Sequence, residues 1–319
     1  MTTRGSGVVA LSVVLPVFNG EASLDEAISS ITRQSFGDFE LLVVDDGSSD
    51  GSAAIARRHA AADPRVKLRS NPGKGLVAAL NHGIEQASAD LIARMDADDV
   101  ALPARFERQM ARMGGEPDLL VLGTATIRVD DRGKELEVTI PPADPAEISR
   151  RLDRGNPIAH PTVVMRRAAV RAVGGYRRAY VRAEDYDLWL RLAERGKLAN
   201  LEEPLLRYRI GGAFRPELFA RQVLSEVTAR AAAGLRRSGR SDPTGEWDDI
   251  DAARLASLGI DPALIANETA RRALHMARLF RKLGDTDSFH AALRLADEQP
   301  RRGFREAVRY AVRRARVQL

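Results

Sequence analysis

Apolar and polar positions follow two alternating periods along the first part of the chain, and these predict strands and helices in turn. Short apolar runs bounded by turn residues predict buried strands, whereas apolar residues three and four apart predict helices with one buried face. A capping box of Ser23 and Glu26 predicts the start of the first helix. The strands predicted in this part are residues 8–15, 39–44, 66–69 and 90–95. Such alternation predicts a mostly parallel sheet flanked by helices, with ligands beyond the carboxyl ends of its strands.

The pattern changes in the second part of the chain. A strong helix is predicted at residues 184–195, and a polar stretch at residues 236–246 is typical of a linker. Further strands are predicted at residues 119–129, 135–140, 162–165 and 205–210. From Pro216 the pattern is helical to the end. We therefore predict an α/β domain over residues 1–215 and a helical C-terminal region over residues 216–319.

The composition excludes several classes of site and of membrane protein. The 319 residues include no cysteine, which excludes disulfides, zinc–thiolate sites, iron–sulfur clusters and a cysteine nucleophile. The longest apolar stretch, residues 8–18, is interrupted by Ser12 and Pro16 and is shorter than the ~20 residues of a transmembrane helix. Arg4 before this stretch imitates a secretory signal, but no small-residue cleavage site follows, so a buried strand is favoured.

Positive charge is concentrated at the end of the chain. The net charge is +5, and residues 299–319 alone hold seven arginines and one glutamate. The rest of the chain is close to neutral, so we predict no nucleic-acid binding. Residues 301–317 have the period of a basic amphipathic helix, which suits an anionic membrane surface. A last helix packed on the protein with a solvated basic face is an equally good interpretation.

Two acidic clusters follow predicted strands. Residues 96–99 place three carboxylates within four positions, and these repel one another unless a cation or donor neutralises them. Oxygen ligands suit magnesium or manganese, although an acidic cap for the helix beginning near Pro103 is the simpler alternative. Residues 45–50 form a turn whose carboxylates suit donors on a base or ribose. The alternative there is turn chemistry, with Asp50 capping the next helix.

Three further features carry candidate chemistry. The acids of residues 184–187 begin a predicted helix, where they suit either the helix dipole or a general base. Lys74 lies between two glycines before a helix and suits a phosphate, although the P-loop spacing is absent. His160 has no second histidine at metal-ligand spacing, which on its own indicates a structural or hydrogen-bonding residue.

Four motifs taken in order are more specific than any one of them. They are VVLPVFNGE at residues 13–21, LVVDDGSSD at 42–50, ARMDADD at 93–99 and AEDYDLWLR at 183–191. Over residues 10–210 the chain resembles the family 2 glycosyltransferases, which are inverting enzymes with the GT-A fold. The resemblance implies a GT-A type nucleotide-binding sheet flanked by helices.

The resemblance also implies a role for each matching residue. The residues implied in binding the nucleotide sugar are Pro16, Val17, Glu21, Asp45, Asp46, Lys74 and Asp96, with Asp46 or Asp45 reading the base, usually uracil. The implied metal ligands are Asp96 and Asp98, of which Asp98 is the more direct. Asp185 is implied as the catalytic base, and the residues implied on the acceptor side are Glu184, Trp189 and His160.

The implied activity is transfer of a sugar from a nucleotide sugar, expected to be a UDP-sugar, to a hydroxyl of an acceptor. The acceptor class implied is a glycan or lipid-linked molecule of cell-surface polysaccharide or glycolipid synthesis, and the implied cofactor is a divalent metal, Mn²⁺ or Mg²⁺. We expect a cytoplasmic enzyme whose basic helix binds reversibly to the inner face of the membrane.

One departure from the family pattern keeps an alternative open. Many relatives carry a histidine shortly after the Tyr-Arg pair, whereas Tyr208 and Arg209 are followed here by Ile210 and Gly211. Arg209 or Arg215 would then supply positive charge in its place. The alternative is a catalytically degenerate GT-A-fold protein that binds sugar nucleotide or scaffolds an assembly. A nucleotidyltransferase or a dehydrogenase fits less well, because their glycine-rich loops are absent after the first strand.

Overall fold

The computed structural model describes residues 9–211 and 214–299, so the predicted basic helix at 301–317 lies outside the described residues. The chain divides into two compact units. The first contains the residues up to Arg177 together with Leu188–Gly211, and the second contains Arg178–Asp187 together with the residues from Gly212 onwards. A short internal segment therefore belongs with the C-terminal helices. The boundary predicted between residues 215 and 216 stays a prediction.

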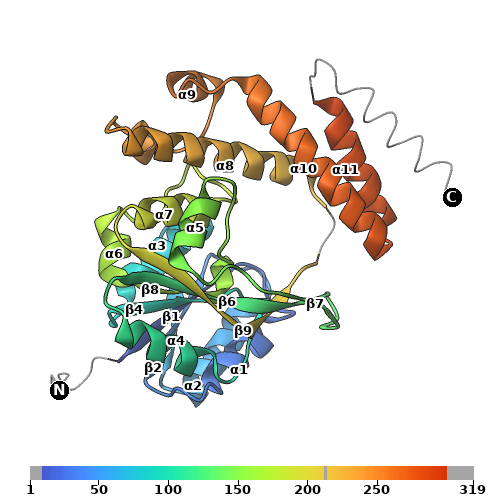
Figure 1. Ribbon diagram of the computed structural model, residues 1–319. Coiled ribbons are helices and arrows are strands. Elements are labelled where there is room, and N and C mark those ends of the chain that lie inside the picture. Colours follow the sequence, from blue (N-terminus) through green and yellow to red (C-terminus); the bar gives the residue numbers. More distant parts are fainter. Residues whose placement is uncertain (1–8, 212–213, 300–319) are drawn as a thin grey trace. The chain divides into compact units, whose positions relative to one another are not determined.

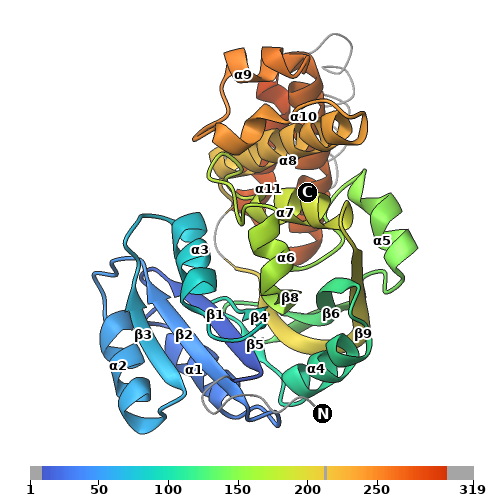
Figure 2. The ribbon, with the colours of Figure 1, turned by 90° about the vertical axis from the view of Figure 1, so that its left-hand side faces the viewer.

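The first unit is built on one sheet with the strand order β3-β2-β1-β4-β8-β6-β9-β5. Its first four strands are parallel: β1 (Leu11–Val17), β2 (Phe39–Asp45), β3 (Val66–Ser70) and β4 (Leu91–Arg94). Val17 pairs with Asp45, which pairs in turn with Ser70, so the carboxyl ends of β1, β2 and β3 meet at one edge. Figure 2 shows these strands side by side. The predicted α/β fold is confirmed, and its parallel part carries both acidic clusters.

The rest of the sheet is mixed. β8 pairs antiparallel with both β4 and β6, β6 pairs in parallel with β9, and β7 extends the sheet from β6. The strands of this part are β5 (Val100–Ala101), β6 (Leu119–Val129), β7 (Glu135–Thr139), β8 (Val164–Arg166) and β9 (Lys197–Arg209). β9 begins well before the predicted residue 205, because the apolar residues Leu198 and Ala199 continue the pairing with β6.

Helices cover both faces of the parallel strands, as Figures 1 and 2 show. Leu11, Val13 and Leu15 of β1 belong to one buried cluster with α1 (Leu24–Thr32), whereas Val14 faces α3 (Leu76–Gln86). A Cβ on Gly83 of α3 would lie 2.4 Å from Val14 Cγ1, so the close approach of helix and strand requires glycine. The other helices of this unit are α2 (Ser52–Ala62), α4 (Arg105–Gly115), α5 (Pro145–Leu152), α6 (Arg167–Ala172) and the last part of α7 (Glu184–Ala193).

The predicted capping box is wrong. Ser23 is the N-cap residue of α1, but its side chain makes no capping hydrogen bond. The hydroxyl instead donates to the carbonyl of Ala97 at 2.9 Å. A long-range bond to the acidic loop therefore replaces the local cap, and it holds the start of α1 beside the segment that follows β4.

The second unit is helical over its described residues after Phe214, as predicted. Its helices are α8 (Pro216–Arg237), α9 (Ala252–Ser257), α10 (Pro262–Leu283) and α11 (Thr286–Glu298). Asp261 and Asp285 accept backbone N–H bonds as N-caps of the last two, and Gly284 ends α10 with a left-handed φ of 74°. The predicted linker contains a short 3-10 helix, Pro243–Glu246. Among the described helices, none combines the length and apolar character needed to cross a membrane.

Candidate active site

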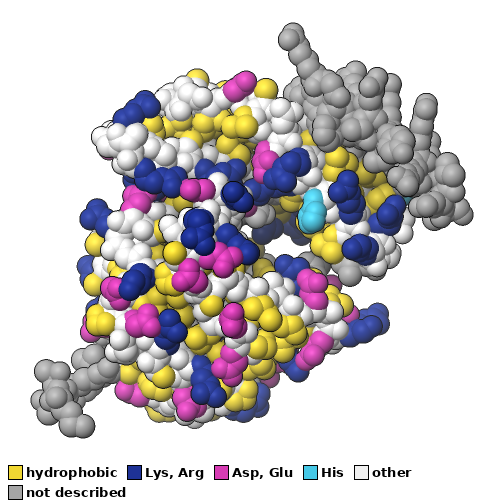
Figure 3. All heavy atoms as spheres, viewed as in Figure 1, with side chains coloured by type: hydrophobic (Ala, Val, Ile, Leu, Met, Phe, Trp, Pro, Cys, Tyr) yellow, Lys and Arg dark blue, Asp and Glu magenta, His cyan; other side chains and the backbone are white. Residues whose placement is uncertain are grey.

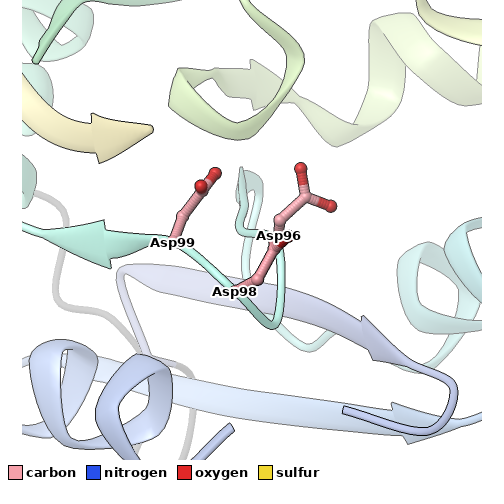
Figure 4. Close-up of side chains that lie close together, drawn as sticks. All are labelled: Asp96, Asp98 and Asp99. Carbon is pink, nitrogen blue, oxygen red and sulfur yellow. The ribbon is translucent and has the colours of Figure 1, made fainter. Parts of the chain in front are cut away.

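Three carboxylates converge in the loop between β4 and β5. Asp96, Asp98 and Asp99 each offer an oxygen that lies within 4.8 Å of the other two. Figure 4 shows the three side chains leaving this loop. Asp98 is exposed, Asp96 is half-buried, and Asp99 is only 1% exposed. The loop thus presents acids of graded burial at the carboxyl end of a parallel strand, the edge where α/β sheets bind ligands.

One of these acids already has a cationic partner. Arg94, the last residue of β4, makes an ion pair with Asp96 at 2.5 Å. Burial lowers the pKa of the Arg94 guanidinium, but the Asp96 carboxylate more than offsets it and the pKa is raised overall. Arg94 is itself held in place, because Arg105 donates to its carbonyl at 2.8 Å. The negative charge of Asp96 is therefore balanced by the Arg94 guanidinium.

Asp99 is the acid that most needs a partner. Burial, reinforced by the charge of Asp96, raises the pKa of Asp99 to about 8. Its Oδ1 accepts the backbone N–H of Arg209 at 2.8 Å, but the buried Oδ2 has no hydrogen-bond partner among the described residues. A buried carboxylate oxygen without a donor is the kind of group that a hard cation satisfies.

The residues therefore fit a divalent metal, with Asp99 joining Asp96 and Asp98. Sequence reasoning placed Asp99 in the acidic run but assigned it no ligand role. The acidic run was the only sequence signal that pointed to Asp99. It did not show which of the acids turns inward.

The acidic turn after β2 is tied to the loops around it. Asp46 accepts bonds from Asn71 Nδ2 at 2.6 Å and from the Gly75 backbone N–H at 2.9 Å, so it joins β2 to the start of α3. Asp45 accepts the N–H of Ser48 at 3.2 Å, which is the turn chemistry considered above. Asn71 is a residue that sequence reasoning missed, because a lone asparagine after an edge strand carries no signal.

The loop after β1 packs against the same turn. Pro16 and Val17 are in register with Val44 and Asp45, and the Val17 carbonyl accepts the N–H of Asp46 at 2.9 Å. Glu21 follows and accepts the N–H of Gly51 at 2.9 Å. The predicted donor residues from these two strands thus lie together.

Three other residues border these loops. Asp50 accepts the N–H of Ser52 at 3.0 Å and the N–H of Glu21 at 3.0 Å, but the N-cap residue of α2 is Gly51, so the alternative in which Asp50 caps this helix is wrong. Lys74 is exposed just before α3. Phe18, which sequence reasoning treated only as part of an apolar run, is 63% exposed beside this loop. An exposed aromatic face is a suitable surface for stacking a base.

His160 forms an aromatic cluster with Tyr176 and Trp189 in the first unit. Its Nε2 lies 2.8 Å from the Tyr176 hydroxyl, and its ring is nearly perpendicular to the Trp189 ring at 5.9 Å. Burial, and secondly the charge of Arg94, holds the pKa of His160 well below 6.5. This neutral, buried ring matches the hydrogen-bonding interpretation. A role of His160 or Trp189 on the acceptor side stays a prediction.

The predicted base lies in the first turn of α7. Asp185 is half-buried, and its Oδ1 accepts the N–H of Tyr186 at 2.7 Å. Glu184 is 7% exposed. Both residues belong to the second unit, whereas Trp189 of the same helix belongs to the first. The structure thus places the candidate base and the acidic loop in different units.

Arg209 forms hydrogen bonds that hold the acidic loop in place. Its guanidinium donates to the carbonyls of Asp98 at 2.9 Å, Asp130 at 3.1 Å and Asp131 at 3.0 Å, and it pairs with Glu26 at 3.4 Å. It therefore braces the loop that carries the acids. Arg215, the other arginine considered in place of the usual histidine, lies in the second unit.

Comparison with known proteins gives the family. The model named "Glycosyl transferase family 2" matches residues 12–174, which is about half of the chain and includes both acidic loops. The chain belongs to this family. Family 2 membership agrees with the resemblance seen in the four sequence motifs, and it makes the chain a glycosyltransferase by family.

Relatives and solved structures agree with this assignment. Putative glycosyltransferase EpsE of Bacillus subtilis is 39% identical over 62% of this chain and 72% of its own length. The amylovoran biosynthesis glycosyltransferase AmsE of Erwinia amylovora is 35% identical over 63% and 76%.

Two solved structures share the fold at 16% identity. S. aureus TarS 1–349 in complex with UDP-GlcNAc has a TM-score of 0.55 and covers 90% of both chains. Mannosyltransferase PcManGT from Pyrobaculum calidifontis, in complex with GDP-Man and Mn²⁺, has a TM-score of 0.54 and covers 93% of this chain and 89% of its own.

Proposed function

We propose that the protein is an inverting glycosyltransferase that moves a sugar from a UDP-sugar to a hydroxyl of a glycan or lipid-linked acceptor. The observation that carries the proposal is the buried Asp99 beside Asp96 and Asp98 at the carboxyl end of β4, because its Oδ2 has no hydrogen-bond partner among the described residues. The UDP-GlcNAc bound by TarS supports a uridine donor, although PcManGT binds GDP-Man. The biosynthetic role named for AmsE supports an acceptor from cell-surface polysaccharide or glycolipid synthesis.

The mechanism follows from the chemistry of these groups. Asp98 and Asp99, with Asp96 held by Arg94, would bind Mn²⁺ or Mg²⁺, which supplies charge neutralisation for a departing nucleoside diphosphate. The loops that hold Asp46 and Glu21 orient the nucleoside. Asp185 accepts the proton of the acceptor hydroxyl while that oxygen attacks the anomeric carbon. A new carbon–oxygen bond forms as the bond to the diphosphate breaks on the opposite side, so the anomeric configuration inverts.

A thermal-shift panel tests the donor site. UDP, GDP, dTDP and CMP are each added with and without Mn²⁺ to the wild type and to Asp98→Asn. A ligand that binds only the folded state stabilises it by about 2.7 kcal/mol at a hundredfold excess over Kd. We expect a shift with UDP that requires Mn²⁺ and is lost in Asp98→Asn. If none of the four nucleotides shifts the wild type, the proposed donor site is rejected.

A second experiment separates an active transferase from a degenerate one. Removing a general base costs about 10²- to 10⁴-fold in rate, so Asp185→Asn should lose that much turnover while keeping the nucleotide shift. A near-wild-type rate would reject Asp185 as the base. Nucleotide binding by a wild-type protein that turns over no donor would favour the catalytically degenerate alternative, which the missing histidine after Arg209 keeps open.

We also propose that the enzyme works in the cytoplasm at an anionic membrane face. The proposal rests on the arginines of residues 301–317, which lie outside the described residues. On the face shown in Figure 3, acidic and basic side chains are interspersed, so this face offers no continuous basic surface of its own. The full-length chain should float with anionic vesicles, whereas a chain that ends at Gln299 should not. Equal flotation of both would remove the membrane role from the tail.

A further inference from the structure

The first turn of α7 belongs with the C-terminal helices. Residues 184–187 lie in the same compact unit as the chain from Gly212 onwards, whereas Leu188 and the residues after it belong to the sheet unit. One helix therefore begins in one unit and ends in the other. The candidate base Asp185 lies in the part that the helical unit holds.

Specific bonds attach this segment to α8 and to the loop after it. Tyr180 is fully buried, and its hydroxyl donates to Thr244 Oγ1 at 2.7 Å. Ser225 of α8 donates its hydroxyl to the carbonyl of Val181 at 2.9 Å. Thr244 in turn donates to Asp242 at 2.6 Å. The backbone leading into α7 is thus held by side chains that come from more than 40 residues later in the chain.

The residue next to the candidate base is also attached to α8. Tyr186 is 1% exposed, and its side chain is hydrogen-bonded to Arg230 of α8. Burial raises the pKa of the Tyr186 phenol, so the phenol remains neutral and the Arg230 guanidinium is the charged donor. Since Tyr186 follows Asp185 directly and gives it a backbone N–H bond at 2.7 Å, a shift of the tyrosine moves the base.

Arg230 shares α8 with Glu226, which belongs to a network of charges that joins α8 to α10. Glu226 of α8 accepts bonds from Gln222 at 3.0 Å and from Arg272 of α10 at 2.5 Å. Arg272 also donates to Glu268 at 2.7 Å. Glu226 and Arg272 both act electrostatically on Tyr186. These charge pairs join α10 to α8, the helix that carries Arg230, and give that helix more rigid support than a single surface pair supplies.

We propose that Tyr186 and Arg230 are positioning residues for the transfer reaction, through which the helical C-terminal region fixes the first turn of α7 and hence the Asp185 carboxylate. The inference rests on the proposed function, in which Asp185 is the base. Its physical reason is that catalysis by a positioned base is sensitive to displacement, since a misplacement of about 1 Å can cost about 10²-fold in rate. The helices of the C-terminal region then position the catalytic base in addition to stabilising the chain.

The test uses the full-length protein with Tyr186→Phe, Arg230→Gln and the matched control Arg271→Gln. Arg271 lies on α10 in the same network, pairs with Glu268 at 2.7 Å and points to solvent, with its side chain 68% exposed. Turnover is followed as nucleotide release to water from UDP-GlcNAc, UDP-glucose, GDP-mannose and dTDP-glucose with Mn²⁺. We expect kcat to fall about tenfold or more in the first two variants. KM for the donor should stay within about twofold, and the control should match the wild type.

A double mutant separates positioning from general damage. If Tyr186 acts through Asp185, adding Tyr186→Phe to Asp185→Asn costs no further rate, because the base whose position it controlled is gone. An equal loss in both backgrounds would overturn the inference while leaving Asp185 as the base. A wild-type rate in Asp185→Asn would instead reject Asp185 as the base, which is the part of the proposed function on which the inference rests.

Amide hydrogen exchange tests the same inference without turnover. Exchange in a peptide covering residues 178–188 should quicken about tenfold or more in Tyr186→Phe and Arg230→Gln, and should be unchanged in Arg271→Gln. Unchanged exchange in both variants would overturn the inference even if no donor is turned over.

Discussion

Glu40 is a buried carboxylate whose replacement tests how the parallel strands are held together. Its side chain is 3% exposed and accepts four hydrogen bonds. Three come from Ser12 Oγ at 2.6 Å, Ser88 Oγ at 2.6 Å and Lys67 Nζ at 2.7 Å, and the fourth comes from the Ser88 backbone N–H at 2.7 Å. One residue of β2 therefore ties together β1, β3 and the turn before β4. Glu40→Gln keeps the size of the side chain and removes its charge.

The pKa of Glu40 gives the size of the expected effect. Burial raises this pKa, but the bonds from Lys67, Ser12 and Ser88 outweigh burial and lower it from 4.5 to about 2. A tenfold change in proton affinity corresponds to about 1.4 kcal/mol, so the charged form contributes at most about 3 kcal/mol to stability. Because the pKa is lower in the folded state, this contribution is present above about pH 4.5. It is lost as the pH falls from there towards 2.

Urea unfolding, followed by circular dichroism at pH 7 and at pH 3, measures this contribution. We expect Glu40→Gln to lower the free energy of unfolding by about 2–3 kcal/mol at pH 7 and by clearly less at pH 3. Glu85→Gln, on the exposed side of α3, is the matched control and should differ little from the wild type. A loss below about 0.5 kcal/mol at pH 7, or one that is the same at both pH values, would refute the reasoning.

Three shorter predictions concern other parts of the sheet unit. Gly83→Ala brings a methyl group 2.4 Å from Val14 Cγ1 and should cost about 1–3 kcal/mol in calorimetry, whereas Gly114→Ala, in open space, should cost nothing. Asp99→Asn should abolish the Mn²⁺-dependent part of the UDP thermal shift, and a full shift would contradict a ligand role for Asp99. His160 should show constant ring shifts by NMR from about pH 5.5 to 8, because burial keeps it neutral, and a midpoint near 6.5 would contradict this.

The strands and helices of the nucleotide-binding half were predictable because each has a strong local pattern. β2 was predicted as residues 39–44 and ends at Asp45, and α3 was predicted as residues 75–86 and begins at Leu76. Pairing partners were harder to predict. Nothing local indicates that the long β9 runs parallel to β6 or that the short β8 lies between β4 and β6, since these pairings depend on burial across distant segments.

The site shows the same division between local and distant information. The acidic run at residues 96–99 indicated either a metal site or an acidic helix cap, because repulsion among neighbouring acids is visible in the sequence, and the family resemblance favoured the metal. The pairing of Asp96 with Arg94 was not visible, nor was the missing partner of Asp99 Oδ2, since both depend on which side chains the β4–β5 loop turns inward. The capping box failed for a related reason: the Ser23 hydroxyl donates to the carbonyl of Ala97, 74 residues away, and does not accept a backbone N–H at the start of α1.

The segment before α7 shows what periodicity alone leaves out. The helical pattern correctly predicted a helix beginning at Glu184, and the family motif within it directed attention to Asp185. Neither indicates that Tyr180, Val181 and Tyr186 are bonded to residues of the C-terminal helices. A family model that ends at residue 174 leaves out both sides of this connection. Substitutions in α8 should therefore change turnover even though the family model does not extend to that helix.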